Sequence, residues 1–189
     1  MNMNKIKLTE SFVVTDKIPK ALKKMLDKEL MIKEIKRAYN NNERVNSSDF
    51  YHDYYYTSLR FMKYYKWIGE YAGDHYSALH KQRIIFSNYS AIVLKPQQSL
   101  LSHNHIDDWD YQENSYDISL LYPLYIFKNK NKENHIHFEY ENGRFKKQRF
   151  KLPLNENFLI MFSSELRHSI SANLTKENMI FISLQFKYE

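Results

Sequence analysis

The stretch NFLIMFSSELRHSISANLTKENMIFISLQF, residues 157–186, decides the fold. It consists of short apolar runs rich in Ile, Leu, Met and Phe, and Ser, Asn and Lys separate one run from the next. Runs of roughly four to eight such residues between turn-forming residues are typical of β-strands, because helices need longer periodic segments. The carboxyl-terminal part of the chain is therefore predicted to be β-structure.

The same texture extends back to residue 83, through the runs RIIF, SAIVLK, SYDISLLYPLYIF, HIHFEYENGRF and RFKLPL. In HIHFEYENGRF, apolar and polar residues alternate up to Asn142-Gly143. This pair tolerates positive φ and predicts a β-hairpin with a type I′ turn. Because no helical segment separates the runs, residues 83–189 are predicted to form a cupin-like jelly roll, the double-stranded β-helix.

Upstream of residue 83 the apolar residues recur with a helical period. Between Ile18 and Tyr39 they are three, four or seven positions apart with Lys and Glu between them, which predicts an amphipathic helix. A polar loop follows, and a second helical period runs from Leu59 to about Leu79. Residues 1–82 are thus expected to be mostly helical. With no visible linker or repeat, residues 1–189 are expected to form a single, mainly β domain with N-terminal helices.

The composition restricts the chemistry that the chain can support. It contains no Cys, which excludes disulfides, thiolate nucleophiles and Cys-bound metals and leaves His and carboxylates as the strong metal ligands. The amino terminus has no apolar signal segment, and no window is long and apolar enough to span a membrane. We therefore expect a cytoplasmic protein that has no membrane partner.

The net charge of +6 is concentrated in one segment, residues 128–151, which we call the basic ribbon. Three Glu residues accompany its eight basic residues, which are Lys128, Lys130, Lys132, Arg144, Lys146, Lys147, Arg149 and Lys151. The ribbon is either a solvated hairpin edge, where Lys also discourages strand-to-strand aggregation, or the binding surface for an anionic partner such as a nucleic acid.

Two segments that contain histidine carry the candidate chemistry. LLSHNHIDDWD (residues 100–110) and FSSELRHSISAN (residues 162–173) each place His at the end of a predicted strand. His105 and Asp107 are two positions apart, so both side chains leave the same face of an extended chain. His168 follows about 60 residues later. Two His and one carboxylate suit non-haem Fe(II), because this set leaves adjacent coordination positions open.

Two other pairs of histidines have the same spacing of two positions. His103 pairs with His105 in this way, so His103 is an alternative ligand. His135 and His137 share the spacing on the predicted hairpin. The hairpin edge is expected to be exposed, and it has no carboxylate placed to close a site around these two residues.

The segments HNHIDDWD, SLLYPL, NFLIMFSSELRHSISAN and NMIFISLQF resemble the small 2-oxoglutarate/Fe(II)-dependent oxygenases of phages and bacteria, over about residues 84–186. The resemblance implies a double-stranded β-helix that uses Fe(II), 2-oxoglutarate and O2 to hydroxylate a small-molecule or peptide substrate. The site residues that it implies are the metal ligands His105, Asp107 (or His103) and His168, with Asn173 and Ser183 nearby.

The chain departs from this family at one position. Members present an Arg about eleven residues after the distal His, where it pairs with the far carboxylate of 2-oxoglutarate, and here that position is Met179. The nearest basic substitutes are Arg83, Arg149 and Lys151. We favour the last two, because they lie on the return strand of the hairpin and adjoining polar residues suggest an inward turn. The predicted co-substrate contacts are therefore Tyr122, Arg149, Lys151, Ser183 and Asn173.

Two other functions are compatible with the sequence. A cupin-like jelly roll that binds a metal or a small ligand without turnover is favoured by Met179. A basic nucleic-acid-associated binding protein is favoured by the basic ribbon, and in that case the histidines would have no role in function.

Overall fold

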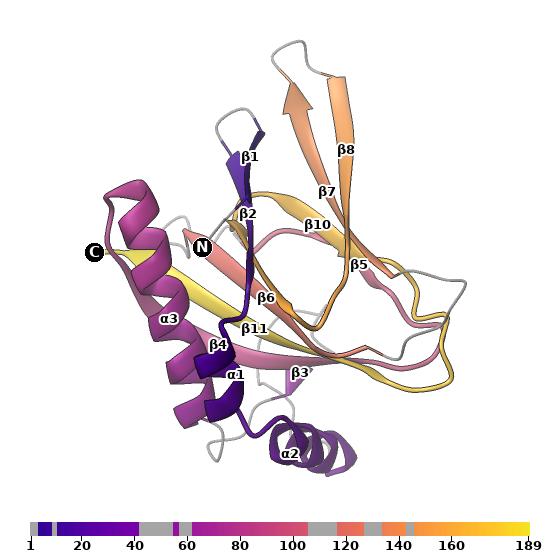
Figure 1. The fold of residues 1–189 in the computed structure, drawn as a ribbon. Coiled ribbons are helices and arrows are strands. Elements are labelled where there is room, and N and C mark those ends of the chain that lie inside the picture. Colours follow the sequence, from indigo (N-terminus) through magenta and orange to yellow (C-terminus); the bar gives the residue numbers. More distant parts are fainter. Residues whose placement is uncertain are drawn as a thin grey trace.

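Two antiparallel sheets pack face to face in the computed structural model (Figure 1). It describes residues 4–8, 11–41, 55–56, 62–105, 117–126, 134–142 and 146–189. The strands of the major sheet, in spatial order, are β1 (Asn4–Leu8), β2 (Ser11–Lys17), β9 (Phe158–Ser163), β6 (Ile118–Tyr125), β11 (Met179–Tyr188), β4 (Ile84–Leu94) and β3 (Tyr55–Tyr56). Those of the minor sheet are β5 (Leu100–His103), β10 (Arg167–Ile170), β7 (His135–Asn142) and β8 (Lys146–Pro153).

Alternation along β11 divides its side chains between two cores. Ile180 and Ile182 pack towards the helices, whereas Met179 and Phe181 pack into the space between the two sheets. All four side chains are fully buried. A strand buried on both faces has a nearly continuous apolar sequence, which is why MIFISLQF appears in the sequence as one apolar run. The predicted mainly β jelly roll is confirmed.

Three helices cover the outer face of the major sheet: α1 (Lys20–Met25), α2 (Lys28–Asn40) and α3 (Met62–His80) (Figure 1). The predicted single helix over residues 18–39 is wrong, because the chain breaks at Leu26 and starts again. The side chain of Asp27 accepts a hydrogen bond from the backbone N–H of Leu30 at 3.0 Å and so caps α2. Among the described residues, no helix is long and apolar enough to cross a membrane.

Two strands precede the helices that were expected to fill the amino-terminal part. β1 and β2 form an antiparallel hairpin, and β2 pairs with β9 at the edge of the jelly roll. In β2, Val13 packs between the sheets and Val14 packs towards the helices. The first 82 residues therefore contribute to the sheet as well as to its cover.

The predicted hairpin of β7 and β8 is confirmed. The register pairs Asn142 with Lys146, which leaves residues 143–145 between the two strands. Gly143 lies outside the described residues, so the predicted type I′ turn stays a prediction.

Two glycines in α3 face β4 at different distances. A Cβ atom on Gly69 would lie 3.1 Å from a ring carbon of Phe86, which is tighter than ordinary packing. A Cβ atom on Gly73 would lie 3.7 Å from the carbonyl oxygen of Ile84, an ordinary van der Waals distance. Of the two glycines, Gly69 therefore leaves less space for a side chain between α3 and β4.

Candidate metal centre

Three histidines meet where the minor sheet approaches β6. His103 ends β5, His105 follows two residues later, and His168 lies on β10 as the register partner of His103. One ring nitrogen from each histidine lies within 4.8 Å of the other two. The ring of His168 has its centroid 4.4 Å from that of His103 and 4.7 Å from that of His105.

The cluster has one apolar wall. The ring centroid of Phe162 lies 4.6 Å from that of His168, and that of Phe138 lies 6.2 Å away. His168 is buried, while His103 and His105 are half-buried. Burial lowers the pKa of His168 well below its ordinary value, and the neighbouring imidazoles of His105 and His103 lower this pKa further. His168 is therefore neutral near pH 7, the form in which imidazole binds metals.

Hydrogen bonds on the Nδ1 atoms determine which ring nitrogens face a metal. The Nδ1 of His168 lies 3.0 Å from the carbonyl oxygen of Leu166, and that of His103 lies 2.8 Å from the carbonyl oxygen of Leu101. A carbonyl can only accept, so in both rings Nδ1 carries the proton and Nε2 carries the lone pair. These contacts are typical of histidines that bind a metal through Nε2.

His105 is held by hydroxyl groups instead. Its Nδ1 lies 2.6 Å from the Oγ of Ser119, and this Oγ lies 2.7 Å from the Oγ of Ser164. Both serines are fully buried. The backbone N–H of His105 also donates to the carbonyl oxygen of Ser164 at 2.9 Å. The turn after β9 and the inner face of β6 thus fix His105 together.

The three imidazoles fit a single metal ion. Nitrogen atoms bound at about 2.1 Å to one ion can be at most about 4.2 Å apart, so small side-chain movements would bring the cluster within binding distance. The structure brings together three of the four predicted ligands, His103, His105 and His168. The fourth, Asp107, lies outside the described residues and stays a prediction.

The predicted inward orientation of Arg149 and Lys151 is wrong. On β8 the alternate residues Phe150 and Leu152 pack into the core between the sheets, which turns Arg149 and Lys151 to the outer face. The side chain of Arg149 is 77% exposed and pairs with the Oε1 of Glu139 at 3.0 Å. Neither residue can contact a ligand between the sheets from this position.

Two other predicted contacts lie away from the cluster. Tyr122 packs in the core beneath the helices, on the opposite face of the major sheet, so its predicted contact with a ligand at the histidines is wrong. Asn173 follows the far end of β10 and is fully buried. Its amide donates to the carbonyl oxygens of Leu94 at 3.0 Å and Glu177 at 2.7 Å, and its Oδ1 accepts from Thr175. Asn173 therefore closes the loop before β11.

Ser183 is buried on the inner face of β11, on the same side as Phe181. Met179, at the position where the family has Arg, is fully buried in the same core. Among the residues whose side chains the structure describes, no Lys or Arg is buried. The described interior therefore lacks the cation that the far carboxylate of 2-oxoglutarate requires, and it does not fit that end of the molecule. Arg83, the third basic substitute, is exposed and pairs with Glu189.

Ser119 and Ser164, which supply the two hydroxyl groups behind His105, are not among the site residues predicted from the sequence. Their only signal is that each is a small polar residue inside or directly after an apolar run, DISLLYPL or NFLIMF. Such serines are common in strands, and the register that places them beside His105 cannot be inferred from one sequence.

His135 and His137 do not join the cluster. His137 lies opposite Lys151 in the register of β7 and β8, on the outer face of the minor sheet. Partial burial lowers the pKa of His137, and His135 and Lys151 nearby lower it further. The pair therefore has cationic neighbours, which disfavour a metal ion.

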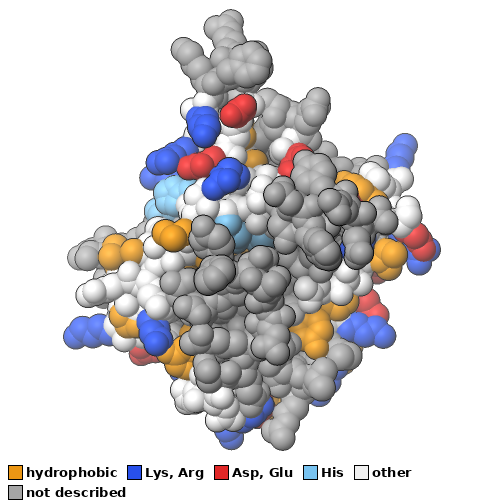
Figure 2. Space-filling view, turned by 180° about the vertical axis from the view of Figure 1, so that it is seen from behind, with side chains coloured by type: hydrophobic (Ala, Val, Ile, Leu, Met, Phe, Trp, Pro, Cys, Tyr) orange, Lys and Arg blue, Asp and Glu red, His pale blue; other side chains and the backbone are white. Residues whose placement is uncertain are grey.

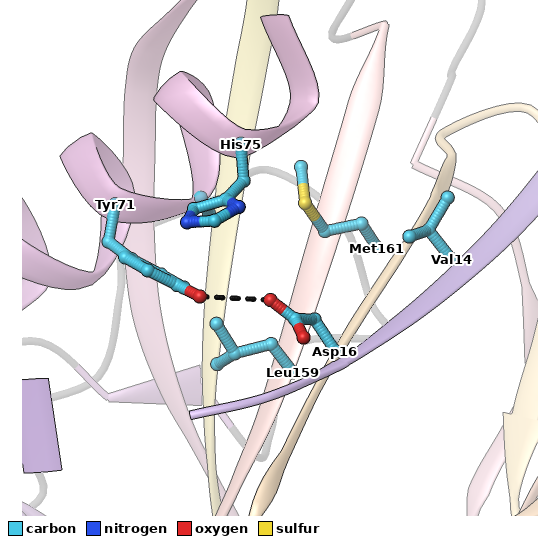
Figure 3. Close-up of a pocket in the computed structure, with 7 residues that line it drawn as sticks. Val14, Asp16, Tyr71, His75, Leu159 and Met161 are labelled. Atoms are coloured by element: carbon cyan, nitrogen blue, oxygen red, sulfur yellow. Dashed lines mark hydrogen bonds between the residues drawn. The ribbon is translucent and has the colours of Figure 1, made fainter. Parts of the chain in front are cut away.

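A second polar pair lies under α3, on the other face of the major sheet (Figure 3). The hydroxyl of Tyr71 donates to the Oδ2 of Asp16 at 2.9 Å, and the ring of His75 lies beside Tyr71. Burial raises the pKa of Tyr71, and the hydrogen bond to Asp16 raises it further. Val14, Ala72, Leu159 and Met161 complete the lining of a small cavity. This pair links α3 to β2.

On the outer face of the minor sheet, two basic residues of the ribbon on β8 lie opposite acidic residues of β7. Glu139 lies opposite Arg149, and Glu141 lies opposite Lys147. Basic and acidic side chains accordingly intermingle near the tip of the hairpin (Figure 2). The remaining basic residues of the ribbon that lie outside the described ranges are Lys128, Lys130, Lys132 and Arg144.

Solved structures share this architecture over most of the chain. A Pseudomonas putida prolyl-4-hydroxylase is 9% identical, with a TM-score of 0.62 over 94% of this chain and 92% of that one. A Trichoplax adhaerens prolyl hydroxylase bound to a hypoxia inducible factor peptide fragment is 10% identical, with a TM-score of 0.60 over 94% and 83%. The epimerase SnoN, bound to Fe3+, α-ketoglutarate and nogalamycin RO, is 10% identical, with a TM-score of 0.64 over 93% and 78%.

At these identities a match shows the fold alone. The chain therefore has the double-stranded β-helix fold of Fe(II)- and 2-oxoglutarate-dependent oxygenases. Neither a family model nor a curated protein sequence matches it.

Proposed function

We propose that the protein binds one Fe(II) at His103, His105 and His168 and acts as an oxygenase that uses a 2-oxo acid, with 2-oxoglutarate as the co-substrate to test first. The observation that carries the proposal is the convergence of three imidazoles, from β5, from the segment directly after it and from β10, in a fold of this kind. Asp107 is a further candidate ligand, because it follows His105 by two positions.

The surroundings of the cluster support oxygenase chemistry. Bound Fe(II) would supply a centre at which O2 is reduced while the 2-oxo acid is decarboxylated and a substrate is hydroxylated. Phe138 and Phe162 exclude water from one side of the histidines. The carbonyl oxygens of Leu101 and Leu166 orient His103 and His168. The half-buried side, at His103 and His105, is the side from which a small-molecule or peptide substrate would approach.

The far carboxylate of 2-oxoglutarate needs a partner that the described interior does not supply. A buried carboxylate without a partner is strongly unfavourable, and Met179 supplies neither charge nor a hydrogen bond at the expected position. Either a basic residue outside the described ranges pairs with the far carboxylate of 2-oxoglutarate, or the co-substrate is a 2-oxo acid with an apolar tail. Phe162 and Phe181 in the core between the sheets favour the second choice.

Metal binding is the first test. Anaerobic titration with Fe(II), or with Mn(II) as a surrogate, should show one ion per chain for the wild type. His103→Gln and His168→Gln should bind the ion at least roughly a hundredfold more weakly, because each removes a ligand from a small set. His135→Gln, which changes a histidine outside the cluster, is the matched control and should keep wild-type affinity. Wild-type affinity in His168→Gln would refute the site.

The second test measures CO2 release and O2 consumption by the Fe(II)-loaded protein with ascorbate present. Three 2-oxo acids are compared: 2-oxoglutarate, pyruvate and 4-methyl-2-oxopentanoate. Turnover of 2-oxoglutarate would mean that a cation outside the described ranges takes its far carboxylate. Turnover of the branched acid alone would mean that the co-substrate has an apolar tail.

A second candidate function is metal or small-ligand binding without turnover. Buried Met179 and the lack of a buried cation in the described interior favour it. It predicts one bound metal ion per chain and no decarboxylation of any of the three 2-oxo acids.

A further inference from the structure

His105 differs from the two histidines beside it in the partner of its Nδ1. His103 and His168 each face a backbone carbonyl, which can only accept a hydrogen bond. His105 faces the hydroxyl of Ser119 at 2.6 Å. A hydroxyl can donate or accept, so this contact by itself leaves the position of the imidazole proton open.

The second hydroxyl, that of Ser164, favours one direction. Ser119 and Ser164 have their Oγ atoms 2.7 Å apart, and both side chains are fully buried. Ser119 contacts both His105 and Ser164, whereas within the described ranges the hydroxyl of Ser164 has Ser119 as its one hydrogen-bond partner. If Ser164 donates to Ser119 and Ser119 donates to His105, both hydroxyl protons have acceptors. In the reverse direction, the buried proton of Ser164 has none, which is unfavourable.

We propose that Ser119, supported by Ser164, holds His105 in the tautomer that carries its proton on Nε2 when no metal is bound. His103 and His168 are then preset ligands, and His105 is a conditional one. Metal binding through the Nε2 of His105 requires the ring proton to move to Nδ1 and the hydroxyl chain to reverse. This exchange moves a proton between two nitrogens of one neutral ring, so the charge of His105 does not change.

The inference rests on the metal-binding part of the proposed function. It gives the two serines a positioning role and an order of events, in which His103 and His168 capture the ion and His105 completes the set. The free energy needed to reverse the hydroxyl chain opposes binding by His105. The loss of His105 should therefore weaken metal binding less than the loss of His103 does.

The experiment is a long-range 1H–15N correlation spectrum of the 15N-labelled full chain, which reports the tautomer of each imidazole. In the metal-free wild type we expect Nδ1–H for His103 and His168 and Nε2–H for His105. With one equivalent of Zn(II), His105 should change to Nδ1–H. An Nδ1–H signal for His105 in the metal-free protein would overturn the proposal.

Ser119→Ala tests the source of the preference. Without the hydroxyl, His105 should lose its preference for Nε2–H in the metal-free protein. Ser119→Thr keeps the hydroxyl and should restore this preference. Ser183→Ala, another buried serine of the major sheet, is the control and should leave all three tautomers unchanged. An unchanged tautomer in Ser119→Ala would also overturn the proposal.

A comparison of two ligand variants separates this inference from the proposed function. Zn(II) affinity should fall further in His103→Gln than in His105→Gln, and the opposite order would overturn the inference. Failure of the wild type to bind Zn(II), Fe(II) or Mn(II) would overturn the proposed function, while the spectrum of the metal-free protein would still decide the tautomer.

Discussion

The hydrogen bond from Tyr71 to Asp16 links α3 to β2 through a carboxylate that is only 6% exposed (Figure 3). Removing the hydroxyl in Tyr71→Phe leaves this buried acceptor without that donor, which should lower the free energy of unfolding by about 1–3 kcal/mol. Urea denaturation measures the change. Tyr140→Phe is the matched control, because the hydroxyl of Tyr140 bonds Gln148 on the exposed surface. Equal effects of the two substitutions would contradict this account.

The side chain of Asn173 holds the loop before β11 through hydrogen bonds to Leu94, Thr175 and Glu177. Because both ends of its amide are satisfied inside the protein, Asn173→Ala leaves several buried groups without partners. We expect a loss of about 3 kcal/mol or more in the free energy of unfolding. In the absence of denaturant, the metal affinity of the folded variant should stay at the wild-type value, since Asn173 follows the opposite end of β10 from His168. A loss of metal affinity in a folded variant would show that the two are coupled.

The histidines could be predicted from the sequence, but most co-substrate contacts could not. For Arg149 and Lys151 the sequence does contain a signal against the predicted contact. They alternate with Phe150 and Leu152, and on a strand with one buried face the apolar residues point inward, so the two basic residues point outward. For Tyr122 no such signal exists. β6 is buried on both faces, so its apolar run does not indicate which side chains face the histidines.

The two glycines of α3 give a matched test of how the helix packs on β4. Ala is more favourable than Gly inside a helix by about 1 kcal/mol, and the Cβ atom of Gly73→Ala would make only ordinary contacts. Gly73→Ala should therefore stabilise the protein by about that amount. Gly69→Ala should gain less or lose stability, because Phe86 has to move. Thermal or urea unfolding of both variants measures the difference, and a larger gain at Gly69 would contradict the packing.

Elements were predictable where their periodicity was long or strongly alternating. The jelly-roll strands and α3 have such patterns, and the structure confirms them. The hairpin of β1 and β2 was missed because SFVVTDK is short and its apolar residues FVV are consecutive, since Val13 and Val14 are buried on opposite faces. The break between α1 and α2 depends on the single cap at Asp27, which the helical period of the surrounding residues conceals.

The basic ribbon is a proposed contact for an anionic partner, and it can be tested on the intact protein. Substituting Lys146, Lys147 and Arg149 by Gln should leave Fe(II) or Mn(II) affinity unchanged, because Lys147 and Arg149 lie on the outer face of the minor sheet. The same variant should bind a DNA oligonucleotide more weakly at low salt and with a shallower salt dependence. Electrophoretic mobility shifts over a salt series measure this. If wild type and variant give the same salt profile, the ribbon is a solvated edge.

The pairing of β2 with β9 has a consequence for how the chain reaches its native state. The backbone N–H of Phe12 donates to the Oγ of Ser163, and these residues are 151 positions apart. During synthesis, β2 therefore emerges from the ribosome long before β9 exists, and the side chain of Val13, which packs between the two sheets, stays exposed until the later strands form. Contacts of such long sequence separation form slowly because the intervening chain must first be ordered. β2 is thus where a nascent chain would most need protection from aggregation.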